Sequence, residues 1–422
     1  VFSYGTGEFS VTGHGGARTI YKPQILKHLS DKRVTQIACG ENHSLILTDK
    51  NDVYSWGKGY EGQLGISDKI EIAAKPNYVK AFFGVPVIFI ACGAFYSLAI
   101  THENKLYGWG EARMGQLGLG MKTRMVRTPT HIPVKESEDT VHSKNVSTVS
   151  VKDENPKLST EETKVIFCSA GLGHTTAITD EGELFIWGFN NCGQLGIGDK
   201  KTRWEPVRAE KDIMGNYLPQ IQKAVCSYYS TYAIDIFGSL YSWGKGYIGH
   251  KNLTIEDLPR KIELNTENKY FTDVFCNKNM VGFYAPIRVY SISPNWGPAY
   301  GGTFISIIGT GFVDSDKLRV RFTYGDLSQE VYCSFDEQTK TLYCKTPKFE
   351  EFEGQKHPSL ALPCECIISV TTDGMNYSEC EETFKIYSND IHLNSVVPKW
   401  GSVKGGAELS LGIDLDPETA KD

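Results

Sequence analysis

The chain has no excess of basic side chains, which sets it apart from proteins that bind nucleic acid through phosphate contacts. Its 422 residues include 44 lysines and arginines against 50 aspartates and glutamates, a formal net charge of -6. Affinity for a nucleic-acid backbone depends on neutralising phosphates with cations. We therefore expect no nucleic-acid partner.

The short motifs of common chemistries are also missing. The sequence contains no Gly-Lys-Ser/Thr phosphate loop, no Gly-x-Ser-x-Gly turn, no His-Glu-x-x-His pair and no set of kinase motifs. None of the eleven cysteines stands in the Cys-x-x-Cys spacing of a zinc site. We predict no catalytic, cofactor-binding or metal-binding residue, and a chain that is not an enzyme.

A secretory signal and a membrane span are not expected either. The chain opens on Val1 without a charged segment, an apolar core or a cleavage site, and its cysteine count is odd, so we expect a reducing, cytoplasmic setting. Residues 81–100 carry no charge over a length that could cross a bilayer. Gly84, Pro86 and Gly93 interrupt this stretch, which favours a pair of buried strands.

A repeat runs through the first two thirds of the sequence. VYSWGKGYEGQLG at 53–65 returns at 106–118 and 184–196, more weakly from Leu240, and in a degenerate form at the start, with Tyr4 in place of Trp. A second marker, IACGENHSLILT, begins at residue 37 and recurs from residues 90, 168, 224 and 274. Self-similarity at a fixed spacing indicates stacked structural units.

Each marker predicts short strands joined by turns and no useful helix. We expect Gly40, Gly93 and Gly171 to supply a positive φ at one turn, and Gly-Gln-Leu-Gly to form another reversal. A unit of this size cannot bury its own apolar face, and radial stacking of small sheets produces a β-propeller. The predicted propeller covers residues 1–285 in five units, at about 1–48, 53–101, 106–179, 184–235 and 240–285.

These markers, Trp-Gly, Gly-Gln-Leu-Gly and the Cys-Gly-x-x-His-Ser turn, resemble the regulator of chromosome condensation repeat. WD40 and kelch repeats lack Gly-Gln-Leu-Gly after the Trp. Propellers of the resembled family usually have seven blades, and five units leave three alternatives: missing N-terminal blades, an open propeller or a smaller closed ring. A polar insertion at 135–164 lengthens the third unit, as a solvated loop or a partner-contacting arm.

The periodic histidines and cysteines favour architecture over chemistry. His43 and His174 have Tyr96, Ser230 and Met280 as counterparts, whereas catalysis requires one unique constellation. One repeat position holds a small apolar side chain that suits core packing: Cys39, Cys92, Cys226 and Cys276.

A different module follows Pro286. Seven strand-like runs suit an immunoglobulin-like sandwich at 286–388, and its Pro294, Trp296 and glycine-rich opening resembles the IPT/TIG family. Pro398 and Trp400 repeat the opening at an offset of 104 residues, so we expect 392–422 to begin a second such domain. Residues 286–387 hold nine basic and fourteen acidic side chains, which opposes DNA binding.

The sequence thus predicts an all-β, non-enzymatic scaffold for protein partners, in a cytoskeletal, ciliary or axonemal assembly. The residues after each Trp-Gly pair are the candidate partner-binding set: Lys58, Tyr60, Glu111, Arg113, Phe189, Asn191, Lys245 and Tyr247. The resemblance implies one alternative, a guanine-nucleotide exchange factor for a small GTPase. We expect such a factor to use the propeller face and the 135–164 insertion, which would act as a wedge against the nucleotide site. A DNA-associated or membrane-receptor protein is a third hypothesis.

Overall fold

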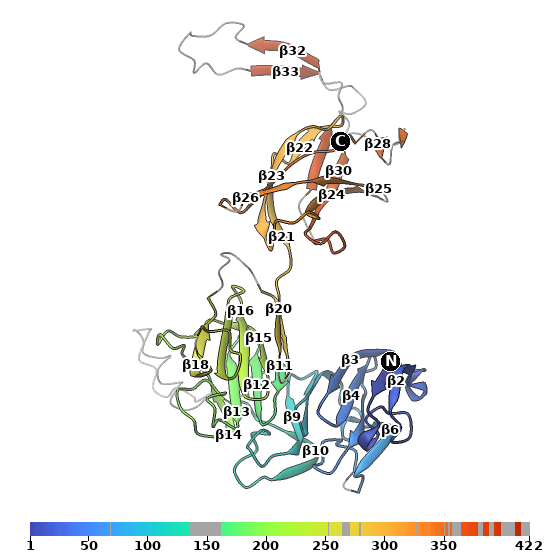
Figure 1. Ribbon diagram of the computed structural model, residues 1–422, viewed down its shortest axis with the longest axis vertical. Helices are drawn as coiled ribbons and strands as arrows, with labels where there is room; N and C mark the ends of the chain where they lie inside the picture. The colour runs from blue at the N-terminus through green and yellow to red at the C-terminus, as the bar shows by residue number, and fades with distance from the viewer. Residues whose placement is uncertain are drawn as a thin grey trace, which may run out of the picture. The chain divides into compact units, whose positions relative to one another are not determined.

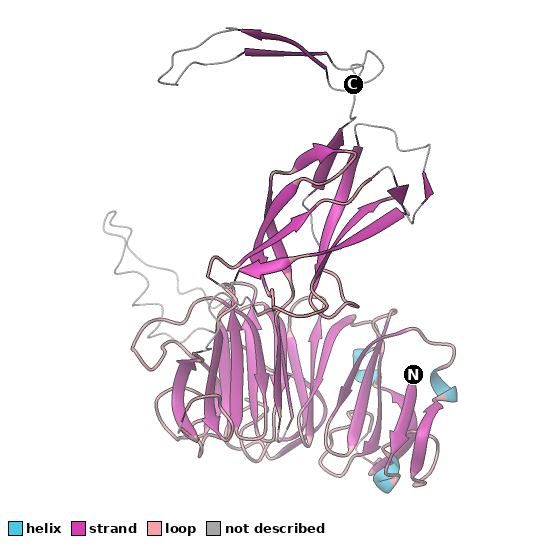
Figure 2. Cartoon of the chain, turned by 45° about the horizontal axis from the view of Figure 1, so that its top comes forward, coloured by secondary structure: helices cyan, strands magenta, loops and turns pink. Residues whose placement is uncertain are grey.

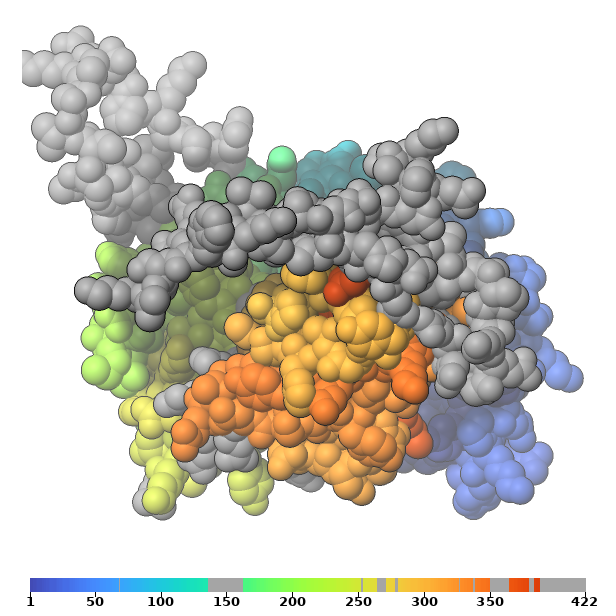
Figure 3. Space-filling view, turned by 90° about the horizontal axis from the view of Figure 1, so that it is seen from above, coloured from blue at the N-terminus to red at the C-terminus, as the bar shows by residue number. Residues whose placement is uncertain are grey.

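The chain forms two separate units in a computed structural model (Figure 1). One unit comprises Val1–Glu267 with Phe271–Tyr284, and the other comprises Asn268–Tyr270 with Ala285–Asp422. Grey marks the segments that the structure does not describe (Figure 3). The described residues are 1–67, 69–135, 162–251, 253–263, 271–277, 280–325, 327–336, 338–349, 351–352, 355–356, 364–378, 383–387, 392–397 and 410–414.

Four antiparallel sheets of four strands form most of the first unit, and its described helices are three single 3₁₀ turns, Glu8–Ser10, Lys27–Leu29 and Lys80–Phe82 (Figure 2). The strands follow one another in order within every sheet. They are β3 (Val34–Cys39), β4 (His43–Thr48), β5 (Val53–Lys58), β6 (Ile72–Tyr78); β7 (Val87–Cys92), β8 (Tyr96–Thr101), β9 (Leu106–Glu111), β10 (Met125–His131); β11 (Val165–Ala170), β12 (His174–Thr179), β13 (Leu184–Gly188), β14 (Arg203–Arg208); β15 (Ile221–Cys226), β16 (Ser230–Asp235), β17 (Leu240–Lys245) and β18 (Ile255–Lys261).

The second strand of every sheet is buried along its whole length, because sheets pack against it on both sides. All six residues of β4, β8, β12 and β16 are buried. The sheets are offset from the units of the sequence repeat. In each four-stranded sheet, the Cys-Gly strand and its partner come from the end of one repeat unit, and the Trp-Gly strand comes from the start of the next. The all-β propeller predicted from the repeat is confirmed, while the count of five units stays a prediction.

A two-stranded sheet stands at each end of the series. At the start β1 (Phe2–Gly5) pairs with β2 (Ile20–Ile25), and at the end β19 (Asp273–Cys276) pairs with β20 (Val281–Tyr284). Residues 81–100 supply β7 and most of β8, so the predicted strand pair is present. All of β8 is buried, whereas only Val87 and Ile90 of β7 are buried, so the expectation of two buried strands holds for β8 alone. Within the described residues, no helix is long and apolar enough to cross a membrane.

The second unit contains a two-sheet sandwich. One sheet has the order β21 (Arg288–Ser293), β23 (Phe304–Thr310), β27 (Thr341–Lys345), β26 (Ser334–Asp336). The other has the order β22 (Trp296–Pro298), β31 (Thr383–Tyr387), β30 (Cys364–Thr371), β24 (Arg319–Tyr324), β25 (Leu327–Tyr332). A small separate pair joins β28 (Glu351–Phe352) to β29 (Gln355–Lys356). Inward side chains of the two large sheets form one core around Ile307, Phe322 and Phe384.

All seven runs predicted for the sandwich are strands, and one of them divides. The run at 329–335 splits at Cys333 into the end of β25 and the start of β26, which lie in different sheets. Further along, β32 (His392–Val397) pairs with β33 (Ser410–Asp414). Its register, His392 opposite Asp414 with an irregularity after Leu393, repeats the β21–β23 register 104 residues later. This is the pairing expected where a second sandwich domain begins.

Candidate interaction face of the repeat unit

Strand direction divides the loops of the repeat unit between two faces. The turns after β3, β7, β11 and β15 and the loops after β5, β9, β13 and β17 lie at one end of the strands, which we call the Trp-Gly face. The turns after β4, β8, β12 and β16 and the connections after β6, β10 and β14 lie at the other end, the opposite face.

The eight predicted partner-binding residues all lie at the Trp-Gly face, at or just after the ends of β5, β9, β13 and β17. They differ in exposure. The side chains of Lys58 and Glu111 are largely covered, and Phe189 is half-buried. The other five are exposed: Tyr60, Arg113, Asn191, Lys245 and Tyr247.

Lys58 is engaged by its neighbours rather than free for a partner. Its ammonium group lies 5.3–5.6 Å from the ring centres of Tyr60, Phe9 and Phe95. It also lies 3.1 Å from a carboxylate oxygen of Glu61. Cation–π attraction and the ion pair hold this side chain in place, so Lys58 shapes the face and offers little charge to a partner.

Every complete sheet contributes at least one exposed residue to this face. Tyr247 is 84% exposed, and its backbone oxygen accepts a hydrogen bond of 3.0 Å from the Tyr232 hydroxyl, which fixes the loop that carries it. Arg113 lies 3.9 Å from Glu111. Burial raises the pKa of the Glu111 carboxyl, and the positive charge of Arg113 opposes that shift only in part.

The repeated tryptophans join each sheet to the preceding one, through a residue whose role the sequence did not reveal. The indole Nε1 atoms of Trp109, Trp187 and Trp243 donate to the backbone oxygens of Gln63, Gln116 and Gln194 at 2.8–3.0 Å. Each Gln side chain also accepts a hydrogen bond from a backbone N–H two residues earlier. The recurrence of Gln in all three copies of Gly-Gln-Leu-Gly was the sequence signal that could have indicated this structural role.

His43 and His174 lie between sheets, which is the packing role that their periodicity indicates. The His43 Nε2 atom is 2.9 Å from the Ser97 hydroxyl, and that of His174 is 3.0 Å from the Thr231 hydroxyl. Tyr96 does the same work, with its hydroxyl 2.9 Å from that of Thr175. Burial lowers the pKa of His43 to about 4 and that of His174 to about 3.

The expectation of a positive φ at Gly40, Gly93 and Gly171 is wrong, because none of them adopts one. These glycines are required by space. A Cβ on Gly40 would lie 2.5 Å from the Gly93 oxygen, and one on Gly171 would lie 2.3 Å from the Ser227 oxygen. The turns of adjacent sheets therefore meet backbone to backbone. Positive φ values occur instead directly after the tryptophans, as at Gly57 and Gly110.

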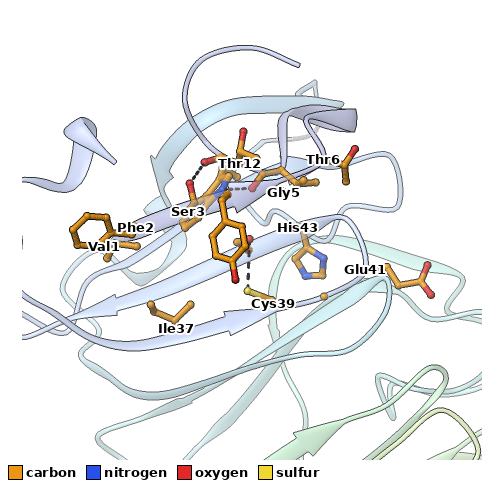
Figure 4. A pocket seen from close by; sticks show the side chains of 15 residues that line it. Val1, Phe2, Ser3, Gly5, Thr6, Thr12, Ile37, Cys39, Glu41 and His43 are labelled. Carbon is orange, nitrogen blue, oxygen red and sulfur yellow. Dashed lines mark hydrogen bonds between the residues drawn. The ribbon is translucent and has the colours of Figure 1, made fainter. Parts of the chain in front are cut away.

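These turns surround a central cavity of about 450 Å³. The recurring cysteines Cys39, Cys92, Cys226 and Cys276 line it, and burial raises the pKa values of Cys226 and Cys276 to about 12. Such thiols stay protonated and serve packing, whereas Cys39, which also lines the pocket shown in Figure 4, is exposed, so the core-packing role expected of it is wrong. Across the cavity, the Tyr228 hydroxyl donates a hydrogen bond to the Glu41 carboxylate, which raises the pKa of Tyr228 to about 12.

The two ends of the polar insertion lie at the opposite face. Residues 136–161 of the predicted 135–164 segment lie outside the described residues, but the chain leaves from the end of β10 and returns at the start of β11. Thr163 donates its backbone N–H to the Val134 oxygen at 3.0 Å and so ties the two ends together. The insertion therefore departs from the face opposite the eight candidate residues.

Among the described residues, no group of three or more His, Cys, Asp or Glu side chains is placed to hold a metal ion. The cysteines of the sandwich that the structure describes are free thiols, including Cys364 and Cys366. Cys380 lies outside the described residues.

Comparison with known families agrees with the motifs. Two family descriptions named "Regulator of chromosome condensation (RCC1) repeat" match residues 34–63, 87–116 and 166–194, and residues 1–47, 50–100 and 181–234. The IPT/TIG domain matches residues 286–380. The chain carries RCC1 repeats and an IPT/TIG domain, as the sequence predicts.

Related proteins differ widely in what they are named for. The ultraviolet-B receptor UVR8 of Arabidopsis thaliana is 32% identical over 278 residues, 59% of this chain and 61% of the receptor. The probable E3 ubiquitin-protein ligase HERC4 of Mus musculus is 28% identical over 298 residues, 67% of this chain and 25% of the ligase. Protein RCC2 of Mus musculus is 27% identical over 58% of this chain and 46% of its own length. The chain thus spans less than two thirds of these relatives.

Solved structures share the fold. Human WBSCR16 superimposes with a TM-score of 0.51 and 22% identity, covering 73% of this chain and 69% of that one. Yeast RCC1 (Prp20), in its crystal structure with Kap60, superimposes with a TM-score of 0.52 and 16% identity, covering 91% of this chain and 83% of that one.

Proposed function

We propose, from the premise that the chain carries RCC1 repeats and an IPT/TIG domain, that it is a non-enzymatic scaffold for protein partners. The Trp-Gly face is the proposed docking surface. One fold of this kind serves proteins named as a receptor and as probable ubiquitin ligases, so the common element is the frame and not one reaction.

The observation that carries this proposal is that recurring and variable residues of the repeat lie in different places. Recurring side chains such as His174 and Trp187 are buried in contacts between sheets. The variable residues that follow each Trp-Gly pair, such as Arg113 and Tyr247, are exposed at one face. Aromatic and arginine side chains on rigidly held loops are common anchors of protein interfaces.

A charge-reversal experiment tests the face. The test variant combines three substitutions in one full chain: Arg113→Glu, Lys245→Glu and Tyr247→Ala. We expect this variant to retain at least tenfold less partner protein than the unaltered chain from an extract of the native organism. Quantitative mass spectrometry measures the retained proteins. The matched control carries Lys50→Glu, Lys105→Glu and Phe237→Ala at turns of the opposite face. Equal retention by the two variants would refute the proposed docking surface.

The alternative function is nucleotide exchange on a small GTPase. It is supported by the resemblance of the repeat to the regulator of chromosome condensation family. Because the insertion departs from the face opposite the eight candidate residues, a GTPase would meet one or the other. Release of a fluorescent nucleotide from a panel of small GTPases tests this alternative. Acceleration that is lost on excision of residues 136–161 would support it, and no acceleration at micromolar protein would end it.

A cytoplasmic scaffold in a cytoskeletal, ciliary or axonemal assembly is the setting that we propose. This setting is supported by a physical argument: a rigid propeller joined to sandwich modules suits a structural component of a larger assembly. Imaging of the tagged protein in its own cells tests the setting. Signal along cytoskeletal or ciliary structures would support it, and a uniform or nuclear distribution would contradict it.

A further inference from the structure

Half of the methionines of the chain gather in one loop at the Trp-Gly face. The sequence holds six methionines, and three of them fall within residues 112–125, the loop that joins β9 to β10 together with the first residue of β10. We call this segment the Met loop. All three are exposed, Met114 by 37%, Met121 by 65% and Met125 by 39%. Single exposed apolar side chains are common on proteins, whereas several on one loop mark a contact surface.

Basic side chains accompany the methionines in the Met loop. They are Arg113, Lys122 and Arg124, and all three are exposed. Residues 112–125 contain no acidic and no aromatic side chain. Arg113 lies 3.9 Å from Glu111, and in the part of the chain that the structure describes, Lys122 and Arg124 form no ion pair. Their positive charges are therefore available to a partner.

The neighbouring sheet continues the positive charge of the Met loop. The loop after β13 presents two exposed lysines, Lys200 and Lys201. Its carboxylate, that of Asp199, is already engaged at 2.8 Å by Arg203. The corresponding loop of the first sheet, residues 59–71, has three acidic side chains against one lysine. The basic surface is thus a local feature of the second and third sheets, in a chain whose net charge is -6.

Hydrogen bonds hold the Met loop in one shape. The Ala112 N–H donates to the Arg124 oxygen at 2.9 Å, which closes the loop at its base. The Gly120 N–H donates to the Trp204 oxygen at 3.0 Å and fastens the loop to the third sheet. Trp204 is half-buried, and Glu205, which follows it, is exposed and gives this edge one negative charge. A preformed loop loses little conformational entropy when a partner binds, so its side chains are suited to anchor one.

Exposed methionines beside unpaired cations match an acidic peptide that also carries apolar side chains. Methionine is flexible and polarisable, and it packs against apolar groups of varied shape. Lysine and arginine form charge-assisted hydrogen bonds with carboxylates. Nucleic acid fits this surface less well, because single-stranded bases stack on aromatic rings and the Met loop contains none. The net charge of -6 also opposes a phosphate backbone.

We propose that the Met loop binds an acidic peptide segment of a partner protein, whose carboxylates meet the three basic side chains and whose apolar side chains meet the three methionines. This inference rests on the proposed docking function of the Trp-Gly face and adds the chemical class of the partner. Lys122 and Arg124 are not among the eight predicted residues. Variants at these two positions therefore test the chemistry of the partner separately from the variant at Arg113, Lys245 and Tyr247.

Selection from a library of random peptides displayed on phage shows what the full chain binds. The enriched peptides are expected to carry a net negative charge together with Leu, Ile, Phe or Met. Enrichment of neutral or basic peptides, or no enrichment, would overturn the proposal. Labelled single-stranded and duplex DNA of random sequence are measured in parallel. Tighter binding of either DNA than of the enriched peptides would also overturn it.

Charge reversal in the Met loop tests where such a peptide binds. Lys122→Glu combined with Arg124→Glu is expected to weaken binding of an enriched acidic peptide at least tenfold, measured by fluorescence anisotropy. Added salt is expected to weaken binding to the unaltered chain, because it screens exposed charges. The matched control, Lys50→Glu combined with Lys105→Glu, changes turns of the opposite face and is expected to leave the affinity unchanged. Equal affinity of the two double variants would sink the proposal.

The methionines have a pair of variants of their own. Met121→Ser removes apolar surface from the Met loop and is expected to weaken binding of the same peptide roughly fivefold. The control Met214→Ser changes a methionine that is exposed on the opposite face, and it is expected to leave the affinity unchanged. If the two variants bind the peptide equally, the methionines are not the apolar contact that we propose.

The failure of this inference is distinguishable from the failure of the docking surface. The variant with Arg113→Glu, Lys245→Glu and Tyr247→Ala separates them. Enriched peptides without an acidic bias that this variant no longer binds would leave the Trp-Gly face as the docking surface and overturn only the acidic partner. Enriched peptides that this variant binds as well as the unaltered chain does would count against the Trp-Gly face itself.

Discussion

Single side chains of the repeat act mainly between sheets. His174 reaches the Thr231 hydroxyl of the next sheet, and that hydroxyl donates to the Gln194 oxygen at 2.7 Å. The same Gln194 oxygen accepts from Trp243 at 2.9 Å. One backbone oxygen thus gathers two donors at each junction, and loss of the Thr231 hydroxyl would leave the buried His174 Nε2 atom without this partner.

Acid is expected to destabilise the repeat unit through His174. Its pKa is about 3 in the folded chain against 6.5 for the free side chain, so protons bind the unfolded chain first and stability falls as the pH drops below about 6.5. At pH 5 the loss is roughly 2 kcal/mol. Urea unfolding at pH 7 and pH 5, followed by tryptophan fluorescence, measures it.

The free energy of unfolding is expected to differ between pH 7 and pH 5, and His174→Gln is expected to reduce this difference by about 2 kcal/mol. His102→Gln, at an exposed turn, is the control and is expected to leave the difference as in the unaltered chain. An identical pH dependence in His174→Gln would show that the acid effect arises elsewhere.

Gly118→Ala is expected to lower stability by about 1–3 kcal/mol. Its φ is +64°, and an added Cβ would lie 2.9 Å from Nε1 of Trp187 in the next sheet. Gly120→Ala is the matched control: its φ is +88°, but its Cβ would meet only Glu205, at 4.0 Å. Chemical unfolding of both variants separates the steric term from backbone strain. Equal losses would contradict the close approach of Trp187.

Among the elements, the long insertion connects β10 of the second sheet to β11 of the third. The Val134 oxygen accepts both the backbone N–H and the side-chain hydroxyl of Thr163, at 3.0 and 2.9 Å. The ends of the loop are thus held together at its base. Connections between elements tolerate changes in length well when their ends already meet.

Replacement of residues 136–161 by a short Gly-Ser turn is therefore expected to change the stability of the repeat unit by less than about 1 kcal/mol. Unfolding of the shortened chain by urea measures this. A loss of several kcal/mol would show that the insertion packs on the sheets. The same variant serves the exchange assay described above.

Strand placement was predictable because strand signals are local. Alternation and turn residues located the first three strands of each complete sheet at the two markers, as for β7 and β8 within residues 81–100. The fourth strands β6, β10, β14 and β18 lie at neither marker and were not predicted. The division of 329–335 between two sheets was not predictable, since the switch at Cys333 depends on which neighbour each half finds.

At the scale of the whole chain, the two units have separate cores. Ile307, Phe322 and Phe384 belong to the core of the sandwich, whereas Trp187 and Trp243 belong to cores of the repeat unit. Units with their own cores unfold as separate cooperative bodies.

Calorimetry is expected to show two transitions, each sensitive to its own core. Phe322→Ala should cost the sandwich about 3–5 kcal/mol, and Ile178→Ala should cost the repeat unit about 2–5 kcal/mol. Each variant is expected to lower one transition and leave the other in place. A single transition that both variants shift would contradict independent units.

The sequence by itself determined the repeat, the sandwich and the strands at the two markers, because these depend on spacing along the chain. The tertiary structure alone decided what each repeat does for its neighbour: Trp109 reaches the Gln63 oxygen, and Gly40 leaves room for the backbone at Gly93. It also showed that Lys58 is held among aromatic rings and that the insertion departs from the opposite face. Such facts arise between units far apart in sequence, where no local pattern records which atoms meet.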